Sequence, residues 1–504
     1  MKATRLTKVA LLLAAVCLPM FASADDFQVG SFWYTINEDG KSASVVQHSS
    51  YRAFEGALII PDAVQYSARY YPVTAIANSA FYACSRLTSV TLGGNISTIG
   101  NFAFSACGAV TRVTLPTSLT SIGNGSFGSC VGLTSVTLPA SLTTIGVGAF
   151  QTCSSLTSVT IPASVTSIGS GAFSSCEALS NMTVATGNTR YDSRGNCKAI
   201  VETASNTLIS GCKNSTIPSS VTSIGQSAFS GCTGLKNLSL PASVTSIGSF
   251  AFQGCTGLTN LTIPATVALI GNVAFVGCSG LSSIVVEAGN PHYDSRDNCN
   301  AIIETPSSTL LTGCKNTVIP SSVTTIGMQS FLDCTGLTNI TIPSSVTSIG
   351  AQAFSDCTGL KRVNIPSSVR SIGDSGFYHC TNLTRIDAYP APAYVTLGRR
   401  VFMGVPKDRT LHVLPKYMSA YQTADQWNEF TPMVADLTDP FKKGDVNGDG
   451  NVGATDIACV VNVLAGLEDA AQYGGRADVT GDGGAVTAAD IAAIVNILAG
   501  LVQN

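Results

Sequence analysis

Oxygen-bearing side chains with a regular spacing lie between residues 445 and 490. The first group follows the pattern D-x-N-x-D-G and comprises Asp445, Asn447, Asp449, Asn451 and Asp456. Calcium takes about six to eight oxygen ligands, and this spacing wraps them around one ion, with glycine at the sharp bend. Asn451 would contribute its backbone carbonyl, and the other four residues their side chains. We therefore predict a calcium site in this loop.

A second, less regular group follows. Its candidate calcium ligands are Asp478, Thr480, Asp482 and Asp490. Thr480 offers a neutral hydroxyl where the first loop has an amide, and one added residue near Gly484 delays the last acid by one position. Because fewer of its oxygens keep the expected spacing, we expect the second loop to bind calcium less tightly than the first.

Two helices must position these ligands. Apolar residues at Ile457, Val460, Val461 and Leu464 follow the first loop with helical spacing, and residues 491–501 follow the second in the same way. This spacing predicts helices that bury one apolar face. Two loop–helix halves without the entering helix of an EF-hand resemble a type I dockerin, over residues 441–504. The resemblance implies calcium-dependent docking to a cohesin-like scaffold.

The positions that often carry partner contacts in dockerins are mostly alanine in this chain. They lie just before the last acid of each loop, at Ala454, Thr455, Ala488 and Ala489. Two interpretations therefore stay open: a module that binds a cohesin, and a plain stabilising cap.

The rest of the sequence contains few features of an enzyme. The four histidines are scattered, and no G-x-S-x-G, H-E-x-x-H or phosphate-loop pattern occurs. Only 11% of the residues are charged and the formal net charge is −3, so the chain lacks the basic stripe that nucleic-acid binding requires. We predict that the protein is not an enzyme and does not bind nucleic acid.

The first 24 residues have the regions of a secretory signal peptide. A basic start with Lys2, Arg5 and Lys8 precedes an apolar core at residues 9–18, which is too short to span a bilayer. Small residues at 22–24 provide a cleavage site. Lipidation of the cysteine in the apolar core is the less favoured alternative, because a bulky valine precedes it. We predict a bacterial protein that is exported and has no membrane span.

From residue 84 the chain repeats with a period of 23 residues, as C-x-x-L-x-x-V-x-L-P-x-x-V-x-x-I-G-x-x-A-F-x-x-C. The cysteines fall at Cys84, Cys107, Cys130, Cys153, Cys176, Cys232, Cys255, Cys278, Cys334, Cys357 and Cys380. A fixed period in the twenties predicts a solenoid, because each turn can bury its apolar face only by stacking on its neighbours.

The pattern within one repeat predicts how a turn folds. Apolar residues at period two across 133–138 predict a strand, which Pro139 stops. Residues 142–145 form a second extended piece, Gly146 permits a tight bend, and Phe150 ends a step that resembles a turn of helix and plugs the core. The predicted core ladder includes Phe104, Phe127, Phe150, Phe173, Phe229 and Phe252.

The repeat resembles the leucine-rich repeats of BspA-like bacterial surface proteins over residues 73–388. The expected fold class is mainly β, a leucine-rich repeat solenoid followed by the small helical dockerin-like domain. Solenoid ends need covers, and we assign an N-terminal cap to residues 25–72 and a C-terminal cap and linker to residues 389–440. The resemblance implies an exported or surface-displayed protein that binds other macromolecules.

Two turns are enlarged, at about residues 185–217 and 287–319. Both contain Y-D-S-R, at residues 191–194 and 293–296, followed by strands that predict a hairpin. The shared tyrosine, acid and arginine are either a ligand feature or the internal contacts of the hairpin, and we favour the second interpretation.

The repeat cysteines occupy equal positions in stacked turns, so their side chains point in parallel and are expected to be buried free thiols. Two pairs instead face each other across the predicted hairpins: Cys197 with Cys212, and Cys299 with Cys314. Bridged and free states of these pairs both stay open.

The outward strand positions are hydroxylic and include Thr91, Thr114, Thr137, Thr160, Thr183, Thr262 and Thr341. This row is either a solvated β surface or a flat hydrogen-bonding surface suited to a protein partner. The later turns are more basic, through Lys236, Lys361, Arg362, Arg370 and Arg385. Such charges would favour an acidic ligand.

These features predict a non-catalytic, secreted or surface-displayed binding or adhesion protein. The solenoid would recognise a host surface or matrix protein, and the dockerin-like module would dock in a calcium-dependent manner. The alternative is an accessory component of a glycan-degrading assembly, attached through dockerin–cohesin pairing.

Overall fold

The computed structural model describes residues 26–49, 54–438, 452–467, 477–480 and 486–499, together with residues 444, 446 and 473. The predicted signal peptide, residues 1–24, lies outside these residues. The chain divides into two compact units: residues 1–235 with 247–251 (unit 1), and residues 236–246 with 252–504 (unit 2).

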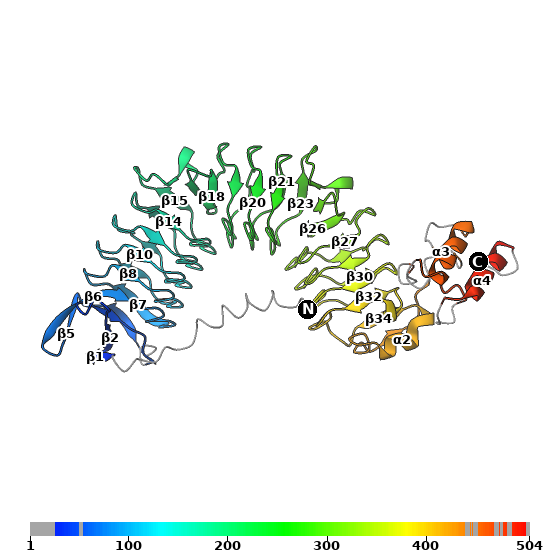
Figure 1. The fold of residues 1–504 in the computed structure, drawn as a ribbon, viewed down its shortest axis with the longest axis horizontal. Helices are drawn as coiled ribbons and strands as arrows, with labels where there is room; N and C mark the ends of the chain where they lie inside the picture. The colour runs from blue at the N-terminus through cyan, green and yellow to red at the C-terminus, as the bar shows by residue number, and fades with distance from the viewer. Residues whose placement is uncertain are drawn as a thin grey trace. The chain divides into compact units, whose positions relative to one another are not determined.

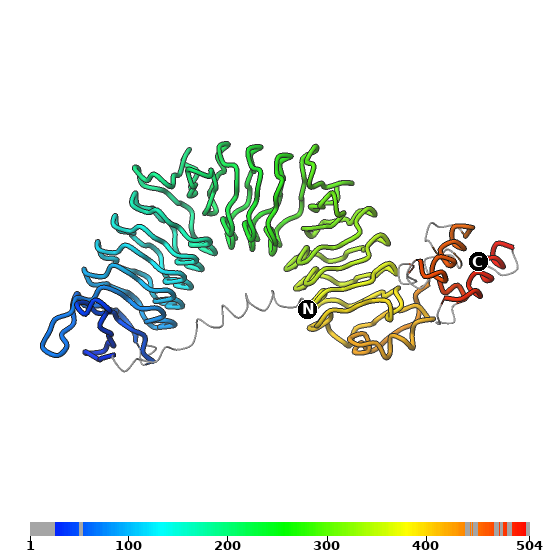
Figure 2. Tube along the Cα trace, in the orientation of Figure 1, coloured from blue at the N-terminus to red at the C-terminus, as the bar shows by residue number. Residues whose placement is uncertain are grey.

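Each regular turn contributes two short strands and one tight corner, and Figure 2 shows such turns stacked within each unit. In the turn that begins at Cys130, the strands are β11 (Ser135–Val136) and β12 (Thr144–Ile145). Gly146 is needed for close packing rather than for an unusual backbone angle. A Cβ atom at this position would lie 2.5 Å from the backbone nitrogen of Asn124 in the preceding turn.

The first strands of the turns lie side by side along each unit (Figure 1) and pair in parallel. We call the surface they form the threonine face, because it carries exposed threonines such as Thr114 and Thr137. In unit 1 one ladder contains β4 (Glu55–Ile59), β7 (Arg86–Thr91), β9 (Arg112–Thr114) and β11, and another contains β13 (Ser158–Ile161) and β15 (Asn181–Val184). The register places each residue beside the one 23 positions later, as for Val113 and Val136.

The second strands form a separate parallel ladder in unit 1. It contains β6 (Arg69–Ile76), β8 (Thr98–Ile99), β10 (Ser121–Ile122), β12 and β14 (Ser167–Ile168). Before the repeats, β1 (Phe27–Val29), β2 (Phe32–Ile36) and β3 (Ala43–Val45) pair antiparallel, and β3 joins β6 in parallel. β5 (Ala63–Tyr66) forms an antiparallel hairpin with β6. This segment differs from the repeats because its strands reverse direction.

Unit 2 repeats the two ladders. Its threonine face contains β21 (Asn260–Ile263), β23 (Ser283–Val286), β28 (Asn339–Ile340), β30 (Arg362–Ile365), β32 (Arg385–Ala388), β34 (Thr410–Val413) and β35 (Met433–Val434). Its second strands are β22 (Leu269–Ile270), β27 (Thr325–Ile326), β29 (Ser348–Ile349), β31 (Ser371–Ile372) and β33 (Thr396–Leu397). β20 (Ser246–Ile247) has one residue in each unit. Short helices η4 (Pro392–Tyr394), η5 (Pro415–Tyr417) and α2 (Met418–Thr423) follow the last repeats.

The corner of each regular turn holds a buried phenylalanine. The rings of Phe104, Phe127, Phe150 and Phe173 stack with centroids 5.4 or 5.5 Å apart, and Phe229 and Phe252 are also fully buried. The predicted core ladder is therefore confirmed at all six positions. The helix-like step predicted at the corner is instead a series of tight turns, in which the Cys153 N–H donates to the Phe150 carbonyl at 3.2 Å.

Each enlarged turn adds an antiparallel hairpin, as predicted. The first contains β16 (Tyr191–Asp192), η2 (Arg194–Asn196), β17 (Ile200–Glu202) and β18 (Thr207–Ser210), and β18 pairs in parallel with β19 (Ser223–Ile224) of the next turn. The second contains β24 (Tyr293–Asp294), η3 (Arg296–Asn298), β25 (Ala301–Glu304) and β26 (Thr309–Gly313). The insertion adds no extra corner to the stack. The Ser175 N–H of the turn before the insertion donates directly to the Ser230 carbonyl of the turn after it, at 2.7 Å.

Beyond residue 440, two helices form with a core of their own. They are α3 (Ala454–Leu464) and α4 (Ala488–Leu498), and the core contains Val446, Val460, Ala477, Val479, Ile494 and Ile497. Both predicted helices are confirmed, although each begins three residues before the predicted start. Within the part of the chain that the structure describes, no helix is both long enough and apolar enough to cross a bilayer.

Candidate calcium loops and binding surfaces

Asp456 is the candidate ligand of the first loop that the structure describes; Asp445, Asn447, Asp449 and Asn451 lie outside the described residues. Its buried carboxylate accepts hydrogen bonds from the Val446 N–H at 2.7 Å and from the Gly453 N–H at 2.8 Å. Because Gly453 is the N-cap of α3, the second bond fixes the start of the helix. The last acid of the loop is therefore joined to the loop's beginning and to the helix.

The second loop brings three of its four candidate ligands together. The Thr480 hydroxyl lies 3.1 Å from Asp478 Oδ1 and 3.0 Å from Asp490 Oδ1. Asp482 lies outside the described residues. The convergence of two carboxylates and one hydroxyl is the grouping that the sequence predicts for this loop.

In both loops a backbone N–H group from the start of the loop donates to the last acid. The Thr480 N–H donates to Asp490 at 2.9 Å, as the Val446 N–H does to Asp456. Both donors lie ten residues before the acid, so the donor is the second residue of the first loop but the third of the second. The bulge that the sequence predicts near Gly484 lies outside the described residues.

The environment of Asp490 favours its charged form. Burial raises the pKa of this carboxyl, but hydrogen bonds from the backbone and hydroxyl groups of Thr480 and Thr487 outweigh burial, so the pKa lies below its ordinary value. A charged, hydrogen-bonded carboxylate suits a hard cation.

The donors of the second loop fit calcium by their chemistry, because they are all oxygens. Among the described residues, no three His, Cys, Asp or Glu side chains lie close enough together to hold a metal ion. A cation at the second loop would therefore depend on the Thr480 hydroxyl, on backbone carbonyls and on Asp482 as well as on its two described acids. Both predicted sets contain three acids, and they differ in Thr480, which takes the position of Asn447 in the first loop.

Two pairs of apolar side chains on the helices are exposed. Val461 and Leu464 on α3 are 44% and 42% exposed, and Val495 and Leu498 on α4 are 47% and 50% exposed. Helical spacing groups Val461 and Leu464 with Ile457 and Val460, but of these four side chains only Val460 is buried. Val460 fills the core of the region, so its neighbour Val461 points outward. In both halves a buried residue is followed by an exposed valine, so the two helices present equivalent apolar surfaces.

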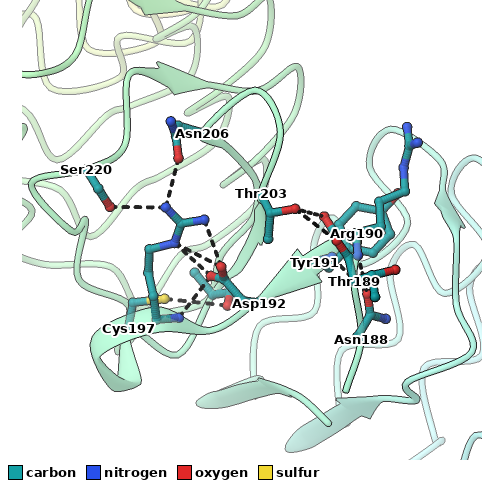
Figure 3. A network of polar contacts seen from close by, with 11 residues as sticks. Asn188, Thr189, Arg190, Tyr191, Asp192, Cys197, Thr203, Asn206 and Ser220 are labelled. Atoms are coloured by element: carbon teal, nitrogen blue, oxygen red, sulfur yellow. Dashed lines mark hydrogen bonds and ion pairs between the residues drawn. The ribbon is translucent and has the colours of Figure 1, made fainter. Parts of the chain in front are cut away.

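The charged residues that the two enlarged turns share are bonded within the first turn itself (Figure 3). Arg194 donates through Nε to Asp192 Oδ1 at 2.8 Å and through Nη2 to Asp192 Oδ2 at 2.7 Å. Its Nη1 donates to Asn206 Oδ1 at 2.8 Å, and the second copy repeats the Asp–Arg pair with Asp294 and Arg296. These contacts favour the internal-contact interpretation over a ligand feature.

The tyrosine of each enlarged turn ends a strand ladder. The Ile168 N–H donates to the Tyr191 hydroxyl at 3.1 Å, and the Ile270 N–H donates to the Tyr293 hydroxyl at 3.1 Å. In a regular turn the second strand of the next turn pairs on this side, as β14 pairs with β12, whereas β14 is the last strand of its sheet. The tyrosine hydroxyl thus replaces the acceptor that the hairpin displaces.

The paired cysteines of the hairpins are free thiols in this structure, as are the cysteines of the regular repeat. The Cys197 thiol donates to the Ala199 carbonyl at 3.5 Å, and the Cys212 thiol to the Lys198 carbonyl at 3.2 Å. The Cys197 carbonyl accepts from the Thr216 N–H at 3.0 Å. Each thiol therefore contacts a carbonyl of its own hairpin rather than the other thiol.

Hydroxyl groups on the threonine face fall into two classes. Those where the first strand begins support the fold: Thr111 donates to the Thr88 carbonyl at 3.2 Å, and Thr134 to the Thr111 carbonyl at 3.4 Å. The predicted outward row is exposed at every position except Thr183, which is half-buried and whose hydroxyl lies 3.0 Å from the Thr160 hydroxyl in a hydrogen bond between turns. Between β11 and β13 the face is hollowed into a groove lined by Ser135, Thr137, Ser158, Thr160 and neighbouring residues.

A family model described as the BspA type leucine-rich repeat region matches residues 74–197, 207–299 and 310–413, in six copies. The chain belongs to the BspA-type leucine-rich repeat family. A second model, the dockerin type I domain, matches residues 443–499. Both resemblances predicted from the sequence are confirmed: this BspA-type chain is a mainly β solenoid with a dockerin domain, and such domains imply protein partners.

Solved structures of bacterial leucine-rich repeat proteins are similar to this BspA-type chain. A leucine-rich repeat protein from Bacteroides ovatus is 24% identical with a TM-score of 0.40, covering 81% of this chain and 99% of its own. A leucine-rich cell surface protein from Faecalibacterium prausnitzii is 25% identical with a TM-score of 0.45, covering 86% and 99%. A leucine-rich repeat protein from Eubacterium ventriosum is 21% identical with a TM-score of 0.47, covering 76% and 95%. No curated protein matches the chain.

Proposed function

We propose that this BspA-type protein is a non-catalytic, secreted or surface-displayed binding protein whose threonine face recognises a host surface or matrix protein. The exposed outward row is the observation that supports this best. The hydroxyls at the strand starts serve the fold, whereas Thr91, Thr114 and Thr137 are exposed to solvent. A row of hydroxyls with the regular spacing of a parallel sheet can hydrogen-bond a protein surface without a catalytic group.

Binding of the mature protein to a panel of purified host matrix proteins tests this proposal. Replacing Thr114 and Thr137 by lysine adds two bulky charges to the face and should abolish binding. The matched control replaces Thr98 and Ser167, which are exposed on the second strands of the same unit, and should leave binding intact. The proposal is wrong if no panel member binds, or if both double variants lose binding equally.

We propose that the dockerin domain binds calcium through both loops. In the first loop Asp445, Asn447, Asp449 and Asp456 would supply side-chain oxygens and Asn451 its carbonyl. In the second loop Asp478, Thr480, Asp482 and Asp490 would bind more weakly. The ion would supply the positive charge that lets these carboxylates approach one another.

A second candidate function is an accessory role in a glycan-degrading assembly through dockerin–cohesin pairing. The duplicated exposed pairs Val461–Leu464 and Val495–Leu498 favour it, because exposed apolar patches mark interaction sites. Isothermal titration with type I cohesins tests it. Val461→Lys combined with Val495→Lys should remove binding. The control Thr455→Lys with Ala489→Lys changes exposed positions that often carry partner contacts in dockerins. Comparing the two variants distinguishes the apolar pairs from those positions.

We propose the following organisation of the chain: a signal peptide at residues 1–24, an N-terminal cap at 25–72, repeats at 73–388, a C-terminal cap and linker at 389–440, and the dockerin domain at 441–504. Export through the signal peptide would place the solenoid outside the bacterial cell or on its surface, where a host protein or a scaffold is accessible.

A further inference from the structure

Two arginines lie side by side on the threonine face of unit 2. Arg362 in β30 and Arg385 in β32 are directly opposite each other in the parallel register. The same position holds Arg112 in β9, between two serines, and uncharged residues in other turns, such as Ser135, Asn260 and Asn339. Like charges directly opposite destabilise a strand pair, so this arrangement needs a compensating group.

Asp387 is that group. Its carboxylate side chain, 1% exposed, accepts from Arg362 Nε at 2.8 Å and from Arg385 Nε at 2.7 Å. One buried carboxylate therefore holds both guanidinium groups in fixed orientations. The arginine side chains themselves remain 58% and 35% exposed, so the two cations face solvent from a rigid base.

The surrounding acidic groups do not neutralise the positive charge of the arginine pair. Asp436 pairs with His412 Nδ1 at 2.6 Å and acts on Arg385 only through space. Lys361 is exposed beside Arg362 and adds a third cation. The local charge on this part of the face is positive, although the chain as a whole carries a formal charge of −3.

We propose that Arg362 and Arg385 form an anion-binding site that takes the carboxylate side chains of an acidic peptide segment of a protein partner. Arg362 contacts Asp387 through Nε at 2.8 Å and Nη2 at 2.6 Å, and Arg385 contacts it through Nε at 2.7 Å, so Nη1 of Arg362 and the two Nη groups of Arg385 are not the atoms that bind Asp387. A guanidinium fork matches a carboxylate with two parallel hydrogen bonds. The proposal deepens the proposed role of the threonine face in protein recognition, on which it rests.

The neighbouring surface favours a peptide over an acidic polysaccharide. Asn339 and Thr341 in the adjoining turn are exposed and offer donors and acceptors to a peptide backbone. Among the described residues of unit 2, the large apolar side chains that are exposed include no aromatic ring on which a sugar could stack. The face thus combines fixed cations with hydrogen-bonding groups.

Fluorescence anisotropy of a labelled octaglutamate peptide, with octaglutamine as the neutral control, tests the site on the mature full-length protein. Arg362→Gln and Arg385→Gln should each weaken octaglutamate binding about tenfold, and higher ionic strength should weaken it further. The matched control is Arg112→Gln, because Arg112 occupies the same strand position in β9 between Ser89 and Ser135. It should bind like the wild type.

The triple variant Arg362→Gln, Arg385→Gln, Asp387→Asn separates binding from folding, because it leaves no unpaired buried carboxylate. It should melt as a folded protein and bind no octaglutamate. The proposal is overturned if the wild type does not prefer octaglutamate to octaglutamine, if Arg112→Gln weakens binding as much as Arg385→Gln, or if a sulfated polysaccharide binds and octaglutamate does not displace it. If the threonine variants lose matrix-protein binding but still bind octaglutamate, the result concerns the threonine row and not the arginine pair.

Discussion

The cysteines of the regular turns are hydrogen-bond donors as well as small apolar side chains. The Cys130 thiol donates to the Phe104 carbonyl of the preceding turn at 3.2 Å, and Cys153 donates to the Phe127 carbonyl at 3.2 Å. Burial raises the pKa of Cys130 to about 12. A buried, protonated thiol that points at a carbonyl is a poor nucleophile, which explains how stacked thiols persist unbridged in a protein predicted to be exported.

This pKa shift predicts an alkaline loss of stability. The pKa of Cys130 is raised from 9.0 to about 12 on folding, so its contribution to the free energy of unfolding is fully present below pH 9 and is lost between pH 9 and pH 12. Urea unfolding measured by circular dichroism across this range should show the fall. Cys130→Ser keeps a donor without titrating, so its fall should be smaller. An identical pH profile in this variant would contradict the prediction.

The phenylalanine corner predicts a large cavity effect. Phe150 is fully buried and stacks on Phe127 and Phe173 at 5.4 and 5.5 Å. Phe150→Ala should lower the free energy of unfolding by about 3–5 kcal/mol, because the neighbouring turns cannot close the space. Denaturant unfolding measures the change, and Val147→Ala, at a position 54% exposed, should change it by less than about 0.5 kcal/mol. Equal effects of the two substitutions would show that Phe150 is not a core residue.

Among the elements, the enlarged turns show how a solenoid accepts an insertion. β18 and β26 join the second-strand ladders in parallel, through β19 and β27, while the corner of the preceding turn bonds directly to the corner of the next one, as Ser175 does to Ser230. The strand that precedes each insertion loses its regular neighbour. The hydroxyls of Tyr191 and Tyr293 supply the missing acceptor.

Removing that hydroxyl should expose its function. Tyr191→Phe leaves the Ile168 N–H without its 3.1 Å acceptor and should lower the free energy of unfolding by about 1–2 kcal/mol. Amide hydrogen exchange at Ile168 should accelerate in the variant. The control Tyr70→Phe, at a side chain that is 70% exposed, should change neither quantity. Unchanged exchange at Ile168 in Tyr191→Phe would rule out the acceptor role.

At the level of the whole chain, the dockerin core and the solenoid cores share no residue among those that the structure describes. Separate cores predict separate unfolding transitions. Calcium that binds the folded dockerin domain stabilises that domain alone, by an amount that grows with the logarithm of its concentration. Chelation should therefore lower the melting temperature of the dockerin transition and leave the solenoid transition unchanged in differential scanning calorimetry.

The two calcium loops should respond unequally to mutation. Asp449→Ala should remove most of the calcium-dependent shift in the dockerin melting temperature, because it deletes a well-spaced carboxylate of the first loop. Asp482→Ala should remove less, since the second loop already has Thr480 in place of an amide. Equal losses, or a dockerin transition insensitive to chelator in the wild type, would overturn the assignment of ligands.

The sequence by itself determined the features that depend on the period. In a parallel stack, residue i lies beside residue i+23, as Val113 lies beside Val136. Repetition along the chain therefore predicts contacts in space, including the buried Phe150 ladder, the parallel thiols and the outward threonines. The same logic applies to the duplicated loop–helix halves, where it predicts equivalent last acids in the two loops, and the calcium ligands stay a prediction.

Tertiary structure alone decided the contacts that do not follow the period. Asp387 anchors Arg362 and Arg385, but sequence spacing does not show which partner a charged side chain reaches. Helical spacing placed Val461 on an apolar face, yet the angle at which α3 packs decided that Val460 is buried and Val461 exposed. Side-chain direction depends on packing between elements of unrelated sequence, and a local pattern carries no information about that packing.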